Sequence, residues 1–496
     1  MMNKNRKAVV IFIILHSSFI IFLAGCGTRR TPDLERIFAA TRERKGKPPL
    51  IVVPGILGSQ LVNQKTGEVV WPSAFRAVPD ELELPMTPDL DANRDELAAR
   101  QILETAKLAR LAPEVQVYAE LLNALKTYGG YREGDWDNPP SGGDADTLYV
   151  FPYDWRRDNV ETARALVRRI ADLKHKLNRP DLRFNIIGHS MGGLVARYAA
   201  RYGDADLPPA GQTPVVTWAG ASGINKIFMF GTPNEGSAEA FATLLEGYSV
   251  QEGLRRRIRL LNKLSREDAM TLPSIYQLLP HGAAARFLDE NLQPLKIDLY
   301  DPATWRKYGW TLINDPVYRA RYARGAEGEE PGGAEDERKG AGDPAMLDAY
   351  LAAVLERARR FHEALDLFPP VGPEPVPLFA FGGDCEETLF APVILRDEKK
   401  GRWLTLTSPR EIRASNNRRF SRKEVTRAMF QPGDGRVTRR SLLGTDLATR
   451  RTSALFDTPL PIAYAVFICD THSGLHNNKI LQNNALTLLV NEVMKE

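Results

Sequence analysis

The feature that most constrains how this chain can fold is a serine between two glycines, where an apolar run meets a helix-forming run. The apolar run covers residues 184–187, and the pentapeptide Gly-His-Ser-Met-Gly follows it at 188–192. Residues 194–202 favour a helix, and Gly203 is a typical residue for the end of one. This order of strand, sharp turn and helix is the context in which a G-x-S-x-G sequence forms a nucleophile elbow.

Sterics explain the two glycines of this motif. A serine at the tip of so tight a turn has strained backbone angles, and the strand and the helix pass too close for side chains two residues to either side. Gly188 and Gly192 carry no side chain at these positions. We therefore predict that the Ser190 hydroxyl is pushed out at the top of a sheet as a nucleophile. The Met191 N–H, at the start of the helix, is then free to donate to an oxyanion.

Strand-like and helix-like runs alternate along most of the remaining chain. Further strands are predicted at 50–53, 147–151, 224–230, 378–383 and 462–468. Helical runs between successive strands indicate an α/β fold class with a mostly parallel sheet that is covered on both faces. Helical spacing is also present near 103–111, and 396–422 is predicted to form basic polar loops.

A length of 496 residues is too great for one simple core, so we expect a large insertion or a second domain. Residues 324–343 are rich in Gly, Glu and Ala, which predicts a disordered loop. The predicted parts of the folded body are a first part of the sheet domain at 50–237 with a Pro-rich excursion at 72–113, an inserted helical cap at 238–370, and a second part of the sheet domain at 371–496.

The first 25 residues are typical of a targeting segment. Positive charges precede an apolar stretch at 8–22, which is too short for a comfortable membrane span, and Leu-Ala-Gly-Cys follows at 23–26. This pattern resembles a bacterial lipoprotein signal. It implies removal of residues 1–25, lipid attachment to the Cys26 thiol, a tether at 26–49 and a location in the cell envelope. Gly27 in place of an Asp favours the outer membrane in a bacterium with two membranes. The alternative is an uncleaved anchor.

Composition and motifs argue against several other classes of function. The net charge of +4 is small for this length, whereas a nucleic-acid-binding protein carries a denser basic face. The sequence has no H-E-x-x-H motif and no Walker or Rossmann glycine pattern. We therefore expect no nucleic-acid partner, no metal and no cofactor.

A serine becomes a strong nucleophile only when an imidazole takes its proton and a carboxylate orients that imidazole. In an elbow-containing fold the acid and then the histidine follow the serine, on loops after late strands. His472 stands just after the last predicted strand, and His476 is the alternative base. For the acid, Asp434 lies between two glycines where a carboxylate fits without crowding, and Asp384, close behind another strand, is the alternative.

Two further features lie at the ends of predicted strands. Pro-Gly-Ile at 54–56 opens a Gly-rich loop after an early strand, which is the place for the second oxyanion donor, the Ile56 backbone N–H. Cys385 and Cys469 both follow strand-like runs. They could form a disulfide if these strand ends are neighbours, and the alternative is two separate small apolar side chains.

The motifs at 53–59, 152–156, 188–192, 231–236 and 433–437 occur in an order that resembles the lecithin:cholesterol acyltransferase family, from about Leu50 to the C-terminus. The resemblance implies an α/β-hydrolase fold with a cap and a membrane-contacting excursion. It also implies that Ser190 is the nucleophile, Asp434 the acid and His472 the base, with Ile56 and Met191 as oxyanion donors. Arg436 departs from this family, which usually has a small residue there. The excursion also lacks the cysteine-bridged loop of the animal enzymes.

The function expected from these features is cleavage of a lipid carboxylic ester through an acyl-serine by an envelope lipoprotein of the phospholipase or lipase type. One alternative is an acyltransferase that passes the acyl group to an alcohol such as a sterol or a lysolipid. The other is a surface lipoprotein that binds lipid with a catalytically dead hydrolase fold.

Overall fold

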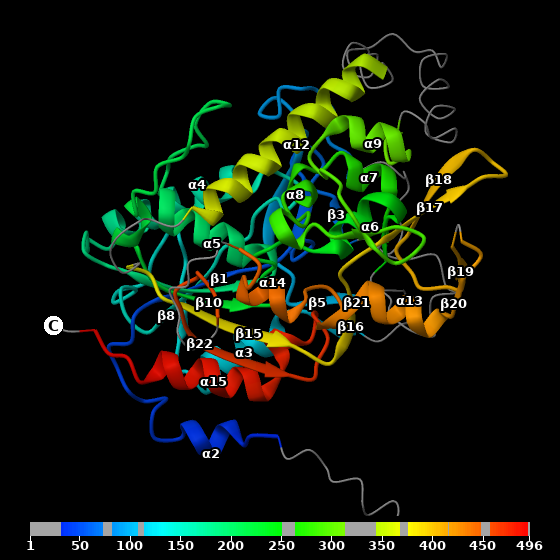
Figure 1. Cartoon of the computed structure of the whole chain (residues 1–496). Helices are drawn as coiled ribbons and strands as arrows, with labels where there is room; N and C mark the ends of the chain where they lie inside the picture. Colours follow the sequence, from blue (N-terminus) through cyan, green and yellow to red (C-terminus); the bar gives the residue numbers. More distant parts are fainter. Residues whose placement is uncertain are drawn as a thin grey trace, which may run out of the picture.

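The computed structural model of the chain describes residues 31–72, 82–107, 114–249, 263–312, 344–367, 375–414, 416–447 and 457–494 (Figure 1). Its centre is a seven-stranded sheet, in which every recorded pairing is parallel. In spatial order the strands are β22 (Ile462–Ile468), β15 (Leu378–Gly383), β10 (Ile224–Phe230), β9 (Phe184–His189), β1 (Leu50–Val53), β8 (Thr147–Val150) and β7 (Arg132–Glu133). The predicted α/β class is confirmed.

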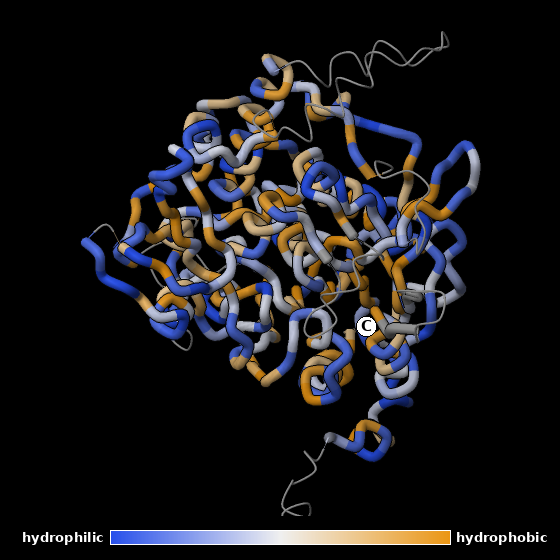
Figure 2. The backbone as a smooth tube through the Cα atoms, turned by 90° about the vertical axis from the view of Figure 1, so that its right-hand side faces the viewer, coloured by the Kyte–Doolittle hydropathy of each residue, from blue (hydrophilic) through white to orange (hydrophobic). Residues whose placement is uncertain are grey.

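Helices cover both faces of this sheet because successive strand side chains point to opposite sides. In β1, Ile51 and Val53 belong to a core shared with helices α4 (Asn159–Lys176) and α5 (Met191–Tyr202). Leu50 and Val52 belong to a second core, shared with α3 (Ala119–Thr127) and α15 (Lys479–Val490). Figure 1 shows α4 and α5 above the sheet, and α3 and α15 below it. Hydrophobic segments concentrate inside, whereas the loops that project at the rim are mostly hydrophilic (Figure 2).

A mainly helical segment leaves the sheet after β10 and returns at β15, its neighbour. The α-helices that the structure describes in this segment are α6 (Ala238–Glu246), α7 (Arg266–Met270), α8 (Pro273–Tyr276), α9 (Pro302–Tyr308) and α12 (Pro344–Asp366). Arg197 and Tyr202 of α5 donate hydrogen bonds to carbonyl groups at the end of α12, which attaches the segment to the sheet domain. The exact limits of the cap at 238 and 370 stay predictions, and the loop at 324–343 lies outside the described residues.

Two local predictions were wrong. In the described part of 103–111, β5 (Thr105–Lys107) pairs antiparallel with β6 (Glu114–Gln116), so pairing with a neighbouring strand outweighs the helical spacing. Residues 108–111 lie outside the described residues. In place of loops throughout 396–422, β17 (Val393–Asp397) and β18 (Arg402–Leu406) form a hairpin that extends a small sheet of the cap. The basic residues of this hairpin are compatible with strands because one face stays in solvent.

The N-terminal part of the fold begins within the predicted tether. Helix α2 (Leu34–Phe38) buries Leu34 and Phe38 in the core that contains α3 and α15. The predicted signal at 1–25 and the lipidation site Cys26 lie outside the described residues. Among the helices that the structure describes, none is both long and apolar enough to cross a membrane.

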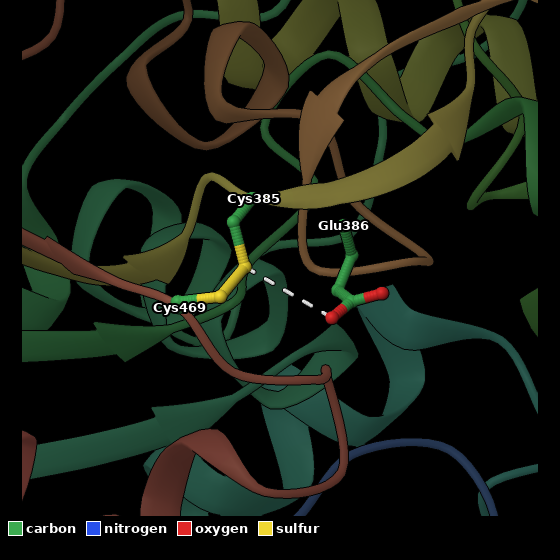
Figure 3. Close-up of side chains that lie close together, drawn as sticks. All are labelled: Cys385, Glu386 and Cys469. Atoms are coloured by element: carbon green, nitrogen blue, oxygen red, sulfur yellow. Dashed lines mark hydrogen bonds between the residues drawn. A yellow bond between two sulfur atoms is a disulfide. The ribbon is translucent and has the colours of Figure 1, made fainter. Parts of the chain in front are cut away.

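A disulfide joins the ends of the two neighbouring strands β15 and β22. Gly383 pairs with Ile468 at the end of the ladder, and the chain then brings Cys385 and Cys469 to a Cα separation of 5.1 Å. Figure 3 shows the bridge, with Glu386 beside it. The sequence left this pairing open, and the sheet order decides it. Among the described residues, one group has the side chains and spacing of a possible metal site: Cys385, Glu386 and Cys469. The disulfide uses both of its sulfur atoms.

Removing this bridge is expected to destabilise the protein. The bridge closes a loop of 84 residues, and a native disulfide of this kind contributes about 2–4 kcal/mol to the free energy of unfolding. We expect the Cys385→Ser/Cys469→Ser variant to unfold at a lower urea concentration than the wild type. A reductant should lower the midpoint of the wild type toward that of the variant and leave the variant unchanged. Equal midpoints for the two proteins without reductant would contradict the prediction.

Candidate active site

Ser190 lies at the sharp turn between β9 and α5 that the sequence predicted. Its backbone φ is 52° and ψ is −123°, a conformation that non-glycine residues adopt only under strain. A Cβ atom on Gly188 would lie 2.7 Å from Gly193 Cα, and one on Gly192 would lie 2.4 Å from the Val53 carbonyl oxygen. Both positions therefore need glycine, because backbone atoms of α5 and of β1 occupy the space.

The loop that carries the predicted second oxyanion donor packs directly against this elbow. A Cβ atom on Gly55 would lie 2.9 Å from Ser190 Cβ, so only glycine allows this approach. Ile56 follows and lines the same cavity as Ser190. Met191 is the first residue of α5, where backbone N–H groups have no partner inside the helix. Ile56 therefore lies at the cavity that Ser190 lines, and Met191 begins the helix that follows Ser190.

Asp434 and His472 form a hydrogen-bonded pair. Asp434 Oδ2 lies 2.8 Å from His472 Nδ1, and the Asp434 carbonyl accepts from the His472 backbone N–H at 2.8 Å. Asp434 Oδ1 accepts backbone N–H bonds from Arg436 and Val437. These bonds fix the carboxylate, which is 2% exposed. With Nδ1–H donating to Asp434, the lone pair of the neutral imidazole stands on Nε2, which is the arrangement a general base requires.

Ser190 and His472 line one cavity of about 330 Å³. In the part of the chain that the structure describes, no hydrogen bond is recorded between the Ser190 hydroxyl and the imidazole. Such catalytic hydrogen bonds are often long without substrate and tighten when it binds. The structure therefore brings the nucleophile, base and acid candidates to one place, with the base and acid already paired.

The alternative candidates have other partners. Asp384 is partly exposed and pairs with Arg439 at 3.5 Å. His476 is 1% exposed, and its Nε2 lies 2.6 Å from the Val117 carbonyl oxygen, to which it donates. Its ring stacks on Tyr118 at a centroid distance of 4.5 Å. The geometry therefore favours Asp434 over Asp384, and a structural position for His476.

Arg436, the departure from the resembled family, leaves the acid undisturbed. Its contact with Asp434 comes from the backbone N–H, which any residue but proline supplies. Its guanidinium pairs with Glu239 at 3.2 Å and lies over the Tyr248 ring at 4.6 Å. Glu239, Tyr248 and Arg436 all line the cavity, to which they add polar groups that the sequence did not predict.

The cavity also has an apolar wall. Side chains from the segment after β1, from strand β3 (Val69–Trp71) and from the following excursion form this wall: Leu57, Trp71, Pro72, Leu103 and Val117. The sequence suggested an excursion near the site but not which of its residues reach the cavity. A pocket of this size with mostly hydrophobic lining and a few convergent polar groups is typical of a small-molecule site.

Burial of Glu235, in the loop after β10, raises the pKa of its carboxyl to about 8 from an ordinary value of 4.5. Asp446 and Asp366 also raise the pKa, whereas Arg440 and the backbone hydrogen bond from Asp446 lower it. Glu235 is 1% exposed. The folded protein therefore binds a proton here over a pH range in which the unfolded chain has lost it.

This raised pKa predicts a loss of stability as the pH rises. The contribution of neutral Glu235 is fully present below about pH 4.5, and it declines as the pH passes through about 8. Glu235→Gln keeps the size of the side chain but cannot ionise. As the pH rises from about 4.5 to about 8, we expect the urea midpoint of Glu235→Gln to fall less than that of the wild type. Parallel curves for the two proteins would contradict the prediction.

Comparisons with known proteins give one family match and several structural matches. Residues 82–307 match the family model of lecithin:cholesterol acyltransferase. The structure described as the crystal structure of the Tle4-Tli4 complex is 13% identical, with a TM-score of 0.52 over 90% of this chain and 99% of that one. Phospholipase PlaB from Legionella pneumophila is 19% identical, with a TM-score of 0.20 over 34% of this chain and 31% of that one. A search of curated protein sequences finds no match.

The family match confirms the resemblance drawn from the motifs, and the fold is that of an α/β-hydrolase. This match supports an enzyme that acts on lipid esters by hydrolysis or acyl transfer.

Proposed function

We propose that this chain, an α/β-hydrolase that resembles the lecithin:cholesterol acyltransferases, cleaves a lipid carboxylic ester through an acyl group on Ser190. In this proposal His472 is the base and Asp434 the acid. The observation that carries it is the 2.8 Å contact between Asp434 and His472, made beside the cavity into which the strained elbow presents Ser190.

The proposed reaction follows from the roles of these groups. His472 Nε2 takes the proton of the Ser190 hydroxyl while Oγ attacks the ester carbonyl carbon. The carbonyl oxygen becomes an oxyanion that the Ile56 and Met191 backbone N–H groups bind, and each such donor stabilises the transition state by about 3 kcal/mol. The tetrahedral species collapses when the protonated His472 gives its proton to the leaving alcohol. Water or a second alcohol, deprotonated by His472, then attacks the acyl-serine and restores the hydroxyl.

The cavity supports a lipid as the substrate. Its apolar lining suits an acyl chain, and its polar groups, which include Arg436 and Glu239, suit the polar part of the same molecule. The hydrolase and the acyltransferase share every step up to the acyl-serine. They differ only in whether water or an alcohol resolves it, so the reaction products distinguish them.

The test is to incubate the wild type and the Ser190→Ala variant with mixed membrane lipids and to identify the products by mass spectrometry. A hydrolase releases a free fatty acid and a lysolipid, whereas an acyltransferase produces a new ester of an added sterol or lysolipid. Both products should be absent with Ser190→Ala. A lipid mixture that the wild type leaves unchanged, together with no labelling of Ser190 by a fluorophosphonate, would favour the lipid-binding alternative.

We further propose that Cys26 carries a lipid anchor that keeps the enzyme at a cell-envelope membrane. The support is the sequence pattern before Cys26. In a bacterial host, the wild type should be found in the membrane fraction and should incorporate labelled fatty acid. Cys26→Ser should lose the label. Equal labelling of both proteins would refute the anchor.

A further inference from the structure

Three consecutive hydrogen bonds connect the loop after β1 with the loop after β22. The Gly55 backbone N–H donates to Tyr118 Oη at 2.9 Å. Tyr118 Oη lies 2.8 Å from His189 Nδ1. His189 Nε2 lies 3.2 Å from the carbonyl oxygen of His472. This hydrogen-bond chain passes through the residue that directly precedes Ser190, and its ends belong to the loops that carry the proposed oxyanion donor and the proposed base.

The chemistry of these groups fixes the direction of each bond. The His472 carbonyl can only accept, so His189 Nε2 carries the hydrogen. Burial keeps the pKa of His189 well below its ordinary value of 6.5, so the imidazole is neutral and Nδ1 has a lone pair. Tyr118 therefore donates its hydroxyl hydrogen to His189, and its oxygen accepts from Gly55. Every donor in the hydrogen-bond chain then has one acceptor.

Packing holds the middle of the hydrogen-bond chain in place. Tyr118 is the residue before helix α3 and is 2% exposed. Its ring stacks on His476, which the Val117 carbonyl orients through His476 Nε2. The ring of His189 packs against the rings of His476 and His472, with centroid distances of 4.4 Å and 5.0 Å. The hydroxyl and the imidazole therefore have little freedom to turn.

We propose that Tyr118 and His189 are positioning residues that hold the Gly55–Ile56 loop and the His472 loop in the correct place relative to Ser190. This inference rests on the proposed function, because it assigns the two residues to the same reaction. They act through the Gly55 N–H and the His472 carbonyl and exchange no proton with the substrate. Three separate chain segments supply the reacting groups, and a displacement of about 1 Å between such groups can cost a hundredfold in rate.

The first test removes one hydroxyl. Tyr118→Phe keeps the ring stack on His476 but loses the bonds to Gly55 and His189. We expect kcat per active site to fall about 10- to 100-fold, with a change in KM below about threefold. Active sites are counted by titration with a fluorophosphonate, and the substrate is a soluble short-chain p-nitrophenyl ester. The free energy of unfolding is measured in parallel, so that a loss of folded protein is not counted as a loss of rate.

The matched control is Tyr131→Phe. Tyr131 is also a buried tyrosine, 3% exposed, and no hydrogen-bond partner of its hydroxyl is recorded among the described residues. Its loss should leave kcat per active site unchanged. The inference is overturned if Tyr118→Phe keeps kcat within about twofold of the wild type, or if Tyr131→Phe lowers it equally.

A double-mutant cycle tests whether the two residues act as one unit. In His189→Gln the side-chain amide can still donate to the His472 carbonyl, but it offers no acceptor at the position of Nδ1. The link to Tyr118 is then lost in either single variant, so Tyr118→Phe/His189→Gln should be no slower than the slower single variant. Losses that multiply would overturn the inference. Ester turnover that survives Ser190→Ala would instead refute the proposed function itself, whatever the result for Tyr118.

Discussion

Replacing Ser190 with alanine is expected to abolish ester turnover while the protein stays folded. Loss of the nucleophile in a serine hydrolase lowers kcat about a millionfold, and only binding and the oxyanion donors then contribute. The Ser190 side chain has no hydrogen bond to His472 in the described structure, and alanine keeps the same backbone strain at a φ of 52°. The free energy of unfolding should therefore change little. Both quantities are measured on the same preparation, with a short-chain ester and a urea titration.

Thr243→Val is the matched control for this variant. Thr243 lines the same cavity, and its hydroxyl donates to the Glu239 carbonyl within helix α6. Valine has nearly the same shape, so the control removes a hydroxyl from the cavity and leaves the nucleophile. It should retain most of the activity. Turnover by Ser190→Ala at the wild-type rate would refute the acyl-serine mechanism.

Replacing Asp434 with asparagine is expected to lower kcat about ten-thousandfold at neutral pH. The carboxylate accepts the Nδ1–H of His472 at 2.8 Å and stabilises the imidazolium that forms when Ser190 attacks. Asparagine keeps the size of the side chain but has no charge, and its amide group can favour the wrong tautomer of His472. KM should change much less than kcat, because Asp434 acts on the base and is 2% exposed.

Asp384→Asn provides the comparison that separates the two acid candidates. Asp384 is partly exposed and forms an ion pair with Arg439. Loss of its charge should therefore leave kcat within about twofold of the wild type. If Asp384→Asn lost the activity and Asp434→Asn kept it, the assignment of the acid would be wrong. A parallel loss in both variants, with a lower free energy of unfolding, would point to damage to the fold instead of the reaction.

Local sequence patterns predicted most of the central sheet, because they depend on near neighbours. The elbow at Ser190 follows from the steric demands of Gly188 and Gly192, and the strands follow from short apolar runs. The prediction failed where short segments pair with a neighbouring strand as hairpins. Helical spacing near 103–111 gave way to the pairing of β5 with β6, and the basic residues of 396–422 include a hairpin that joins the sheet of the cap.

For the candidate site, the sequence named the residue types and left the pairings open. The sequence favours His472 because it stands just after the last predicted strand, and Asp434 because it lies between two glycines. In the structure these two side chains lie 2.8 Å apart, from Asp434 Oδ2 to His472 Nδ1. Tyr118 was not singled out, because its partner His189 lies 71 residues away and no local pattern connects them. The one available signal was a histidine inside the elbow, where a polar ring beside a buried serine needs partners.

The sequence by itself determined the strand, turn and helix around Ser190, since glycine placement and apolar periodicity act over a few residues. Only the tertiary structure decided which carboxylate meets His472, that Cys385 bonds Cys469, and how Tyr118 connects two loops. These contacts depend on the order of strands in the sheet, which places β15 beside β22 and the ends of both near the elbow. Strand order arises from packing across the whole chain, so no short segment contains it.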